Sequence, residues 1–250
     1  MELIGIPWAP EVIAGDDLLA HVAMGCALAD LELRAEDVIV LCQKVVSKSE
    51  GRAVALDSVV PGHEALDLAA RTNRDPRIVE LILRESTQVL RATPHVIVVR
   101  HRTGVVLANA GIDQSNVRQS GEGVALLWPQ DPDASARALR HRLMERYGFA
   151  VGVIINDSIG RAWRRGTVGT AIGAAGIDSL MNLRGVQDRH GRALQSTEVG
   201  HADELAAAAS LVMGQAAEGV PMVIVRGLKA PAGNANAAQL LRPAAEDLFQ

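Results

Sequence analysis

Aromatic residues are scarce in this chain. Two phenylalanines, three tryptophans and one tyrosine make up 2% of its 250 residues. Proteins that bind single-stranded nucleic acid stack the bases on aromatic side chains, and a net charge of -4 provides no excess of cations for a phosphate backbone. These two deficits exclude a general nucleic-acid-binding protein. Because 48% of the residues are hydrophobic, we predict an ordinary globular core built from Val, Ile, Leu and Ala.

Cysteines and long apolar runs are also lacking. Cys26 and Cys42 are the two cysteines, and their spacing fits no metal site. Two cysteines in a chain of this size predict reduced thiols in the cytosol. The N-terminus carries no basic segment before an apolar one, so we expect no signal peptide. No apolar run reaches the roughly 18 residues of a membrane span. We therefore expect a cytoplasmic protein.

Several catalytic motifs are missing from the sequence. It contains no G-x-x-x-x-G-K-[ST] loop, no G-x-G-x-x-G after a predicted strand, and no G-x-S-x-G, H-E-x-x-H or C-x-x-C. These absences argue against P-loop enzymes, dinucleotide-binding folds, serine hydrolases and zinc proteases of the common types.

The hydrophobic pattern predicts mixed α and β structure without the regular alternation of a doubly wound fold. Helices are expected to begin at Asp16 or Asp17, at Asp75-Pro76, at Asp131-Pro132 and at Asp203. Strands are expected over 38–41, 96–99, 105–108, 124–128, 151–155 and 222–225, the second and third forming a hairpin. Five glycines between residues 166 and 185 interrupt an apparent helical pattern. They indicate close approach of the backbone to a ligand or to another backbone.

The most informative segment is Asn156–Gly166, which follows the apolar run 151–155. Asp157 and Ser158 offer the oxygen ligands that hard divalent cations prefer. Three arginines follow within five residues, and guanidinium groups bind phosphate or carboxylate in bidentate fashion; they are Arg161, Arg164 and Arg165. The alternative interpretation is a polar loop at a strand end with a solvated basic turn.

Two further predicted strand ends carry complementary groups. Lys44 and Lys48 follow the strand 38–41, and a cationic loop after a strand suits phosphate. Asp113 and Asn116 follow the strand 105–108 and could share one ligand. The alternative for Lys44 and Lys48 is a solvated surface. The alternative for Asp113 and Asn116 is a turn in which both side chains only form hydrogen bonds to the local backbone. A metal site beside a polyanion site is typical of phosphoryl transfer, so the three strand ends together favour that chemistry.

Taken together, these segments resemble the F420 gamma-glutamyl ligase family, whose members are coenzyme F420-0:L-glutamate ligases. The resemblance runs in the family's order from about Ile4 to Leu228, which gives a ligase domain at 1–228 and a tail at 229–250 that we expect to be the least ordered part. The matching stretches are 5–7, 43–52, 109–117, 156–164, 171–176, 202–206 and 221–227.

The family implies an α+β, two-lobed, mixed-sheet architecture and an intertwined homodimer. It also implies a GTP-dependent ligase that needs a divalent metal, Mg²⁺ or Mn²⁺, and joins L-glutamate to the carboxylate of F420-0, then adds glutamate through gamma links. We expect the reaction to pass through an acyl phosphate, with GTP as co-substrate.

The resemblance also implies roles for individual residues. The metal ligands would be Asp113, Asp157, Ser158, where the family often has threonine, and Gln215. The nucleotide contacts would be Ile6, Pro7, Trp8, Ala9, Gln43, Lys44, Lys48, Asn116, Met213, Gly214 and Gln215. We expect Asp113, Asp157 and Arg161 to take part in catalysis. The role of Arg161 is inferred from its charge and is not implied by the resemblance.

Two alternatives stay open on the residues themselves. One is another nucleotide- and metal-dependent carboxylate-amine ligase or kinase, whose metal and phosphate groups would look alike. The other is a non-catalytic GTP-binding module. Acids at two separate strand ends favour metal-assisted catalysis over nucleotide sensing.

Overall fold

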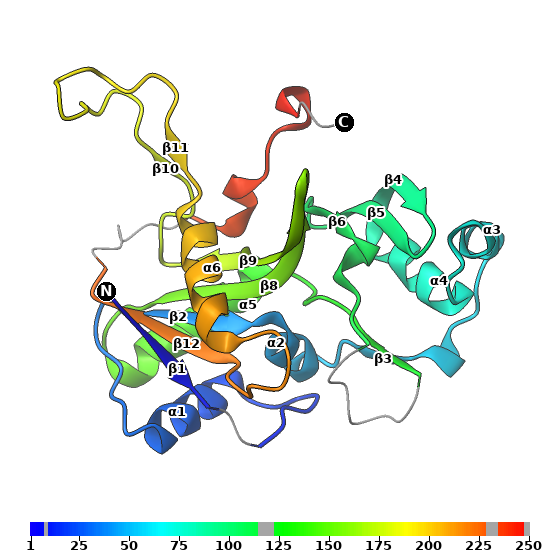
Figure 1. Cartoon of the computed structure of the whole chain (residues 1–250). Helices are drawn as coiled ribbons and strands as arrows, with labels where there is room; N and C mark the ends of the chain where they lie inside the picture. The colour runs from blue at the N-terminus through cyan, green and yellow to red at the C-terminus, as the bar shows by residue number, and fades with distance from the viewer. Residues whose placement is uncertain (8–9, 115–122, 229–234, 248–250) are drawn as a thin grey trace.

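The structure is a computed structural model that describes residues 1–7, 10–114, 123–228 and 235–247. Its centre is a five-stranded sheet in the order β1-β12-β2-β8-β9 (Figure 1). The strands are β1 (Glu2–Ile6), β12 (Met222–Arg226), β2 (Val38–Cys42), β8 (Gly152–Arg161) and β9 (Arg164–Ala175). Strand β2 pairs with β8 in parallel, and the other neighbours in this sheet are antiparallel.

Both faces of the central sheet are buried, as the uninterrupted apolar sequences of its inner strands predict. Ile39 and Leu41 of β2 point to one face, which is covered by α1 (Leu18–Leu28) and α5 (Pro132–Tyr147). Val38 and Val40 point to the other face, which is covered by α6 (His201–Met213). The sheet is therefore the middle layer of a three-layer arrangement.

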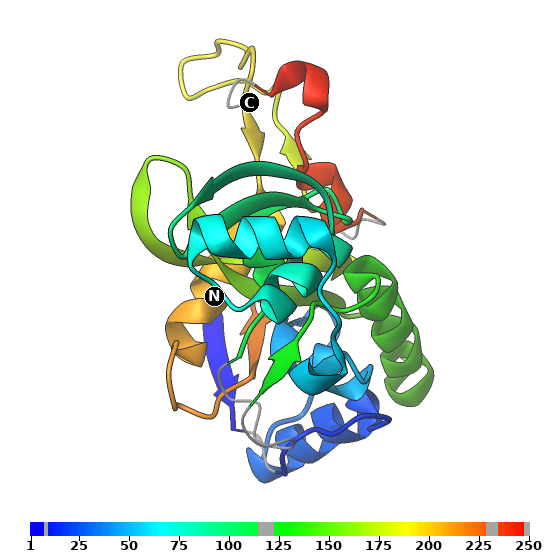
Figure 2. The ribbon, with the colours of Figure 1, turned by 90° about the vertical axis from the view of Figure 1, so that its right-hand side faces the viewer.

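A smaller body is inserted between β2 and β8. After the short helix α2 (Gln43–Ser49), the chain leaves through β3 (Ala53–Ala55) and returns through β7 (Val124–Leu126), which pair with each other. Between them the described residues form two α-helices, three antiparallel strands and a third core. Figure 2 looks onto this body. Its elements are α3 (His63–Thr72), α4 (Pro76–Arg84), β4 (Ser86–Thr93), β5 (Val96–His101) and β6 (Val106–Ala108).

Two peripheral segments complete the fold. A long arm after β9 contains β10 (Met181–Asn182) paired with β11 (Glu198–Val199) and projects away from the central sheet (Figure 1). The described part of the C-terminal segment contains the short helical turns η4 (Ala237–Leu240) and η5 (Ala244–Glu246). Asp133 in the first turn of α5 accepts hydrogen bonds from Ala237 N at 2.8 Å and Ala238 N at 3.3 Å. These hydrogen bonds attach the C-terminal segment to α5.

Most predicted elements are confirmed. The caps explain the helix starts, because Asp17, Asp75 and Asp131 each accept a backbone hydrogen bond at the N-terminus of their helix. The hairpin of β5 and β6 is present, as are the predicted strands 38–41, 151–155 and 222–225. The predicted strand 124–128 is shorter, because pairing with β3 ends at Leu126. Helices and several sheets confirm the α+β class.

Two segments that the sequence predicted to be loops after strands are not loops. Strand β8 does not stop at residue 155 but continues to Arg161, since it pairs with β9 as far as Arg164. Asp157 and Ser158 therefore lie within a strand. The residues after β2 form the helix α2 directly, so Lys44 and Lys48 project from a helix. In both places a neighbouring element, not the local composition, fixed the backbone.

The glycines between 166 and 185 do not belong to a helix. Most of the apparent helical stretch is strand β9, and its glycines allow helices to pack closely against it. A Cβ atom on Gly169 would lie 2.4 Å from the carbonyl oxygen of Ala206 in α6, and one on Gly173 would lie 2.4 Å from that of Pro132 in α5. Close approach to another backbone is the interpretation that the structure confirms.

Both cysteines are free thiols, as predicted. Among the described residues, no helix combines the length and the apolar character that crossing a membrane requires.

Loss of the Asp133 carboxylate should release the C-terminal segment. In Asp133→Ala, the N–H groups of Ala174, Ala237 and Ala238 lose their acceptor. We expect the free energy of unfolding in urea to fall by about 2 kcal/mol and the amide protons of Ala237 and Ala238 to exchange faster with solvent, as hydrogen exchange would measure.

The matched control is Asp188→Ala. Asp188 also accepts backbone hydrogen bonds, two of them, from His190 and Arg192, but at the far end of the arm. This variant should leave the exchange rates of Ala237 and Ala238 unchanged. Equal exchange rates in wild type and Asp133→Ala would show that this carboxylate does not hold the segment.

Candidate active site

A cavity of about 720 Å³ opens beside the ends of β2 and α6 and the middle of β8. Parallel pairing sets Cys42 opposite Asn156, so the start of α2 and the polar part of β8 meet at one edge of the sheet. The loop after β6 and the loop after α6 complete the walls. Eight of the predicted site residues line this one cavity: Lys44, Lys48, Asp113, Asp157, Ser158, Met213, Gly214 and Gln215.

Asp157 is held by a hydrogen bond on each carboxylate oxygen. Its Oδ1 accepts from the backbone N–H of Ser158 at 2.8 Å, and its Oδ2 accepts from Nε1 of Trp128 at 2.7 Å. Burial raises the pKa of Asp157 to about 6, and the negative charge of Asp113 adds to that rise, whereas the two hydrogen bonds and the charge of Lys44 oppose it. The two acids therefore influence each other across the cavity.

Asp113 is tied to the structure through its backbone and its side chain. Its N–H and C=O pair with Leu126 at 3.0 and 2.8 Å, which fixes the loop after β6 against the strand β7. Its carboxylate Oδ2 lies 2.6 Å from Nζ of Lys44. The acid predicted to bind metal and a lysine predicted to bind nucleotide thus form an ion pair.

Ser158 and Gln215 meet although they lie 57 residues apart in the chain. The Ser158 hydroxyl donates to Oε1 of Gln215 at 2.6 Å, which joins β8 to the loop after α6. Both side chains carry oxygen donors on the cavity wall. The structure therefore places the predicted second pair of metal ligands together.

Lys48 also forms an ion pair. Its Nζ donates to Oε1 of Glu11 at 2.7 Å, and Glu11 belongs to the segment after β1 that lines the cavity. A second acid on the wall, Glu218, accepts from the backbone N–H of Ala216 at 2.8 Å, and this hydrogen bond lowers its pKa. Neither glutamate was singled out in the sequence, because nothing in the local pattern distinguishes it from a surface acid.

Some predicted residues lie elsewhere. Gln43 is 1% exposed, and its amide donates to Ser47 within α2, so its side chain is not part of the cavity wall. Ile6 is fully buried in the core and Pro7 is exposed beside it. Trp8, Ala9 and Asn116 lie outside the described residues.

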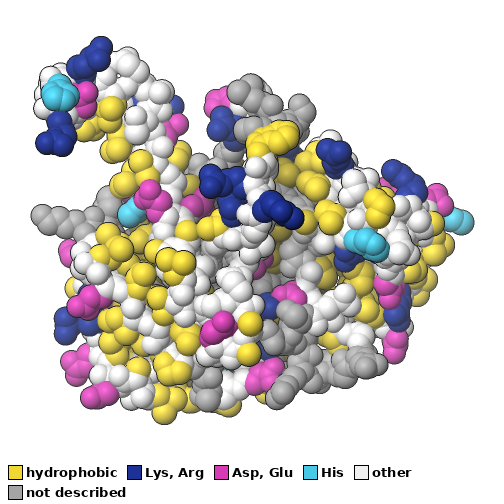
Figure 3. Space-filling model, in the orientation of Figure 1, with side chains coloured by type: hydrophobic (Ala, Val, Ile, Leu, Met, Phe, Trp, Pro, Cys, Tyr) yellow, Lys and Arg dark blue, Asp and Glu magenta, His cyan; other side chains and the backbone are white. Residues whose placement is uncertain are grey.

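The arginines predicted to bind an anion sit at the tip of the β8–β9 hairpin. Arg161, Arg164 and Arg165 are exposed and do not line the cavity, and Trp163 at the turn is 88% exposed with a positive φ of 63°. Figure 3 shows dark-blue cationic side chains around this hairpin. The hairpin continues the strand that carries Asp157, so it extends from the cavity towards solvent.

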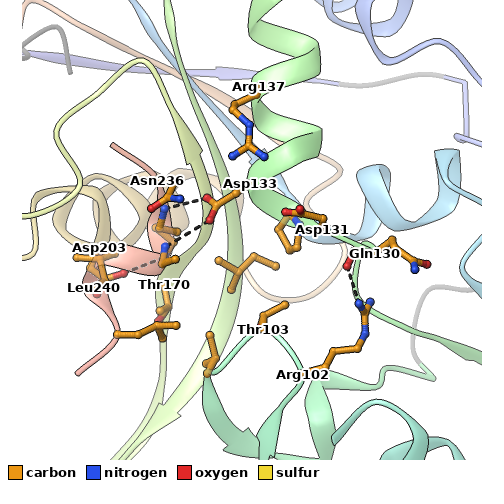
Figure 4. A pocket seen from close by; sticks show the side chains of 17 residues that line it. Arg102, Thr103, Gln130, Asp131, Asp133, Arg137, Thr170, Asp203, Asn236 and Leu240 are labelled. Atoms are coloured by element: carbon orange, nitrogen blue, oxygen red, sulfur yellow. Dashed lines mark hydrogen bonds between the residues drawn. The ribbon is translucent and has the colours of Figure 1, made fainter. Parts of the chain in front are cut away.

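A second cavity, of about 530 Å³, lies between α5, β9 and the C-terminal segment (Figure 4). Its acids are already used by the fold. Asp133 accepts three backbone hydrogen bonds, Asp131 caps α5, and Asp203 accepts from Ala171 N at 2.9 Å. None of the residues that the sequence singled out as metal or nucleotide contacts lines it. The first cavity is therefore the candidate active site.

Within the described residues, no group of three or more His, Cys, Asp or Glu side chains is placed to hold a metal ion. The predicted metal ligands in the candidate site are instead two carboxylates, a hydroxyl and an amide oxygen. Such a mixed oxygen set suits Mg²⁺ or Mn²⁺ rather than Zn²⁺, which prefers nitrogen and sulfur.

Comparison with known proteins identifies the family. Residues 8–227 match the family described as F420-0:Gamma-glutamyl ligase. The chain is 44% identical over 254 aligned residues to the coenzyme F420:L-glutamate ligase of Methanothermobacter thermautotrophicus, covering 100% of this chain and 99% of that protein. It is 45% identical over 249 residues to the enzyme of the same name from Methanopyrus kandleri, covering 98% and 96%. It is 40% identical over 250 residues to that of Archaeoglobus fulgidus, covering 100% and 96%. The chain therefore belongs to the F420-0:gamma-glutamyl ligase family.

Proposed function

We propose that this protein is a GTP-dependent ligase that joins L-glutamate to the carboxylate of coenzyme F420-0 and adds further glutamate through gamma links. One observation carries the proposal: Asp113, Asp157, Ser158 and Gln215, from three separate segments, converge with Lys44 and Lys48 on a single cavity. The relatives named coenzyme F420:L-glutamate ligase support the choice of acceptor and amine.

The oxygen groups of the cavity fit a hard divalent cation. Asp113 and Asp157 repel each other, since the charge of the first raises the pKa of the second. Ser158 and Gln215 add neutral oxygens on the same wall. These four residues would hold Mg²⁺ or Mn²⁺, and the bound cation would offset negative charge on the phosphate oxygens of the nucleotide.

Amide formation requires an activated carboxylate. A carboxylate oxygen of the acceptor attacks the γ-phosphorus of GTP, the bond from that phosphorus to the β,γ-bridging oxygen breaks, and GDP leaves. The amine of glutamate then attacks the acyl carbon, the C–N bond forms, the C–O bond to phosphate breaks, and phosphate and a proton are released. No enzyme nucleophile takes part, in keeping with the absence of nucleophile motifs. The chain contributes positioning and charge stabilisation.

The lysines would change partners when the nucleotide binds. Lys44 pairs with Asp113, and Lys48 pairs with Glu11. Phosphate oxygens would take over both ammonium groups, and Asp113 would then be available to the cation. Each ion pair thus holds its ammonium group oriented on the cavity wall before the substrate arrives.

The hairpin arginines would serve the acceptor, whose phosphodiester and carboxylate are anionic. Arg161, Arg164 and Arg165 are exposed on the continuation of the strand that bears Asp157. Trp163 between them offers one large exposed ring for the flavin-like ring system of the acceptor. The intertwined homodimer that the resemblance implies remains part of this proposal.

A product assay tests the function directly. Purified protein with GTP, Mg²⁺ and L-glutamate should release GDP only when F420-0 is added, and mass spectrometry should detect glutamylated F420. Asp157→Asn should lower turnover by 100-fold or more, equivalent to about 3 kcal/mol of transition-state stabilisation.

The matched control is Asp203→Asn. Asp203 is also a carboxylate whose pKa is raised by burial, but it lines the other cavity. It should retain turnover. GDP release without F420-0 would favour another ligase or kinase, and nucleotide binding without any turnover would favour a GTP-binding module.

Lys48→Ala should weaken GTP binding while leaving the fold intact. Loss of one charged hydrogen bond of 1.5–3 kcal/mol corresponds to roughly a 10- to 100-fold rise in Kd, measured by calorimetry with Mg²⁺ present. Glu11→Gln removes the carboxylate that competes for the same ammonium group, so it should tighten GTP binding. Unchanged GTP affinity in both variants would show that Lys48 does not contact the nucleotide.

Metal affinity should depend on pH through Asp157. Burial and Asp113 raise its pKa to about 6, so the carboxylate is charged above this pH and protonated below it. Because protons compete with the cation, Mn²⁺ affinity should stay level near neutral pH and fall by about tenfold per pH unit below the pKa. The Mn²⁺ affinity at each pH would be measured from the electron paramagnetic resonance signal of free Mn²⁺. An inflection near the ordinary aspartate value would contradict the burial of this group.

A further inference from the structure

Trp128 lies between the two acid-bearing segments of the candidate site, yet it does not line the cavity. It is fully buried and follows β7 on the way to α5. Two residues earlier, Leu126 exchanges both backbone hydrogen bonds with Asp113. The Trp128 indole itself donates to Asp157. One short stretch, Leu126–Trp128, therefore contacts both carboxylate-bearing segments.

The hydrogen bond from Trp128 fixes the orientation of the Asp157 carboxylate. Nε1 lies 2.7 Å from Oδ2, and the backbone N–H of Ser158 lies 2.8 Å from Oδ1. One donor on each oxygen holds the plane of the carboxylate. An ionised carboxylate has about four lone-pair positions, so about two stay available on the cavity side. The indole nitrogen has no acceptor capacity and cannot itself serve as a ligand.

The loop that carries Asp113 rests directly on the same indole. Gly111 has a φ of +66°, and a Cβ atom built there would lie 2.3 Å from Nε1 and 2.6 Å from Cε2 of Trp128. Only glycine fits both the backbone conformation and the contact. A displacement of the indole would therefore disturb the Asp113 loop and the Asp157 carboxylate together.

A part-buried ionic cluster holds the backbone of Trp128 in place. Arg52 Nε donates to the carbonyl of Trp128 at 2.8 Å, and Arg102 donates to the carbonyls of Pro129 and Gln130 at 3.3 and 2.6 Å. Glu85 binds both arginines, at 2.8 and 3.0 Å. Burial opposes the charge of Glu85, but its contacts with His101, Arg102 and Arg52 outweigh this effect and lower the pKa of Glu85 to about 2.

The aromatic face of Trp128 is also packed. The ring of His101 lies 4.9 Å from the indole, centroid to centroid, at an angle of 54°. His101 Nδ1 contacts the Thr103 hydroxyl at 2.9 Å, and its Nε2 lies 3.5 Å from Glu85, an electrostatic contact rather than a hydrogen bond. The indole is thus fixed on its face by His101 and along its edge by Gly111.

We propose that Trp128 is a positioning residue of the ligase reaction, whose indole N–H holds the Asp157 carboxylate towards the cavity and Asp113. The inference rests on the proposed function and deepens it. Groups that orient a metal ligand from behind typically change metal affinity or activity by about 10- to 100-fold when they are removed. The arginine–glutamate cluster supports the same alignment through the backbone.

The test removes the indole N–H of Trp128 and keeps the shape of the side chain. Trp128 is replaced by 3-benzothienylalanine, which carries sulfur in place of the indole N–H, and in a second variant by phenylalanine. We expect Mn²⁺ bound to the whole protein, measured by paramagnetic resonance without nucleotide, to weaken by about 10-fold or more in both variants. Turnover should fall in parallel, and KM for glutamate should change less than kcat.

Leu143→Ala is the matched control, because it cuts a cavity into the same core cluster without contacting Asp157. It should lower Tm but leave the Mn²⁺ affinity of the folded protein unchanged. If the benzothienyl variant binds Mn²⁺ as wild type does, with kcat within twofold, the indole is only a packing group and the inference is overturned.

Failure of the proposed function gives a different result. In that case the wild-type protein itself would not bind Mn²⁺ more tightly than Asp157→Asn does. If wild type binds and Asp157→Asn does not, the metal site stands, and the Trp128 variants alone decide the positioning role.

Discussion

The parallel pairing of β2 with β8 is the constraint on which the rest of the site depends. With Cys42 opposite Asn156, the lysines of α2 and the carboxylate of Asp157 lie at the same edge of the sheet. Parallel strands need a long crossover, and here the crossover contains the whole smaller body. That body returns through β7, which brings Asp113 to the cavity by backbone pairing and Trp128 to Asp157. Strand pairing and catalytic geometry are thus products of the same connections.

Charge is balanced between the side chains of the cavity wall. Each lysine on its wall faces an acid, and the least solvated acid, Asp157, is held by neutral donors from Trp128 and Ser158. A charged group removed from water is stable only with partners, so these pairs stabilise the folded protein around the site proposed for a highly charged substrate. Under the proposed function the same pairs would be exchanged for contacts with phosphate and metal, because the lysines and their partners are ion-paired at a solvent-accessible wall.

Individual residues show which parts of the candidate site could be predicted from the sequence. Asp157, Ser158 and Asp113 could be singled out because acids and hydroxyls after an apolar run offer the oxygen ligands that hard cations prefer. Gln215 came only from the family resemblance, and its contact with Ser158 spans 57 residues. Glu11 and Trp128 were missed, because a single glutamate between Pro10 and Val12 and a tryptophan at the end of a predicted strand have no periodic signature. The loop predicted at residues 156–161 became strand because β9, whose glycines suggested a broken helix, pairs with it.

By itself the sequence determined the α+β class, the three helix starts capped by Asp17, Asp75 and Asp131, and the buried strands at 38–41, 151–155 and 222–225. It did not give the start of α6, which begins at His201 after Gly200 and not at the predicted Asp203. The correct predictions follow from short-range patterns of side chains and from backbone capping, which act within a few residues. Only the tertiary structure decided which acids share a cavity, which lysines they pair with, and that a buried indole donates a hydrogen bond to Asp157. Those relations arise from strand register and packing between segments far apart in the chain, and no local pattern encodes the distance between two such segments.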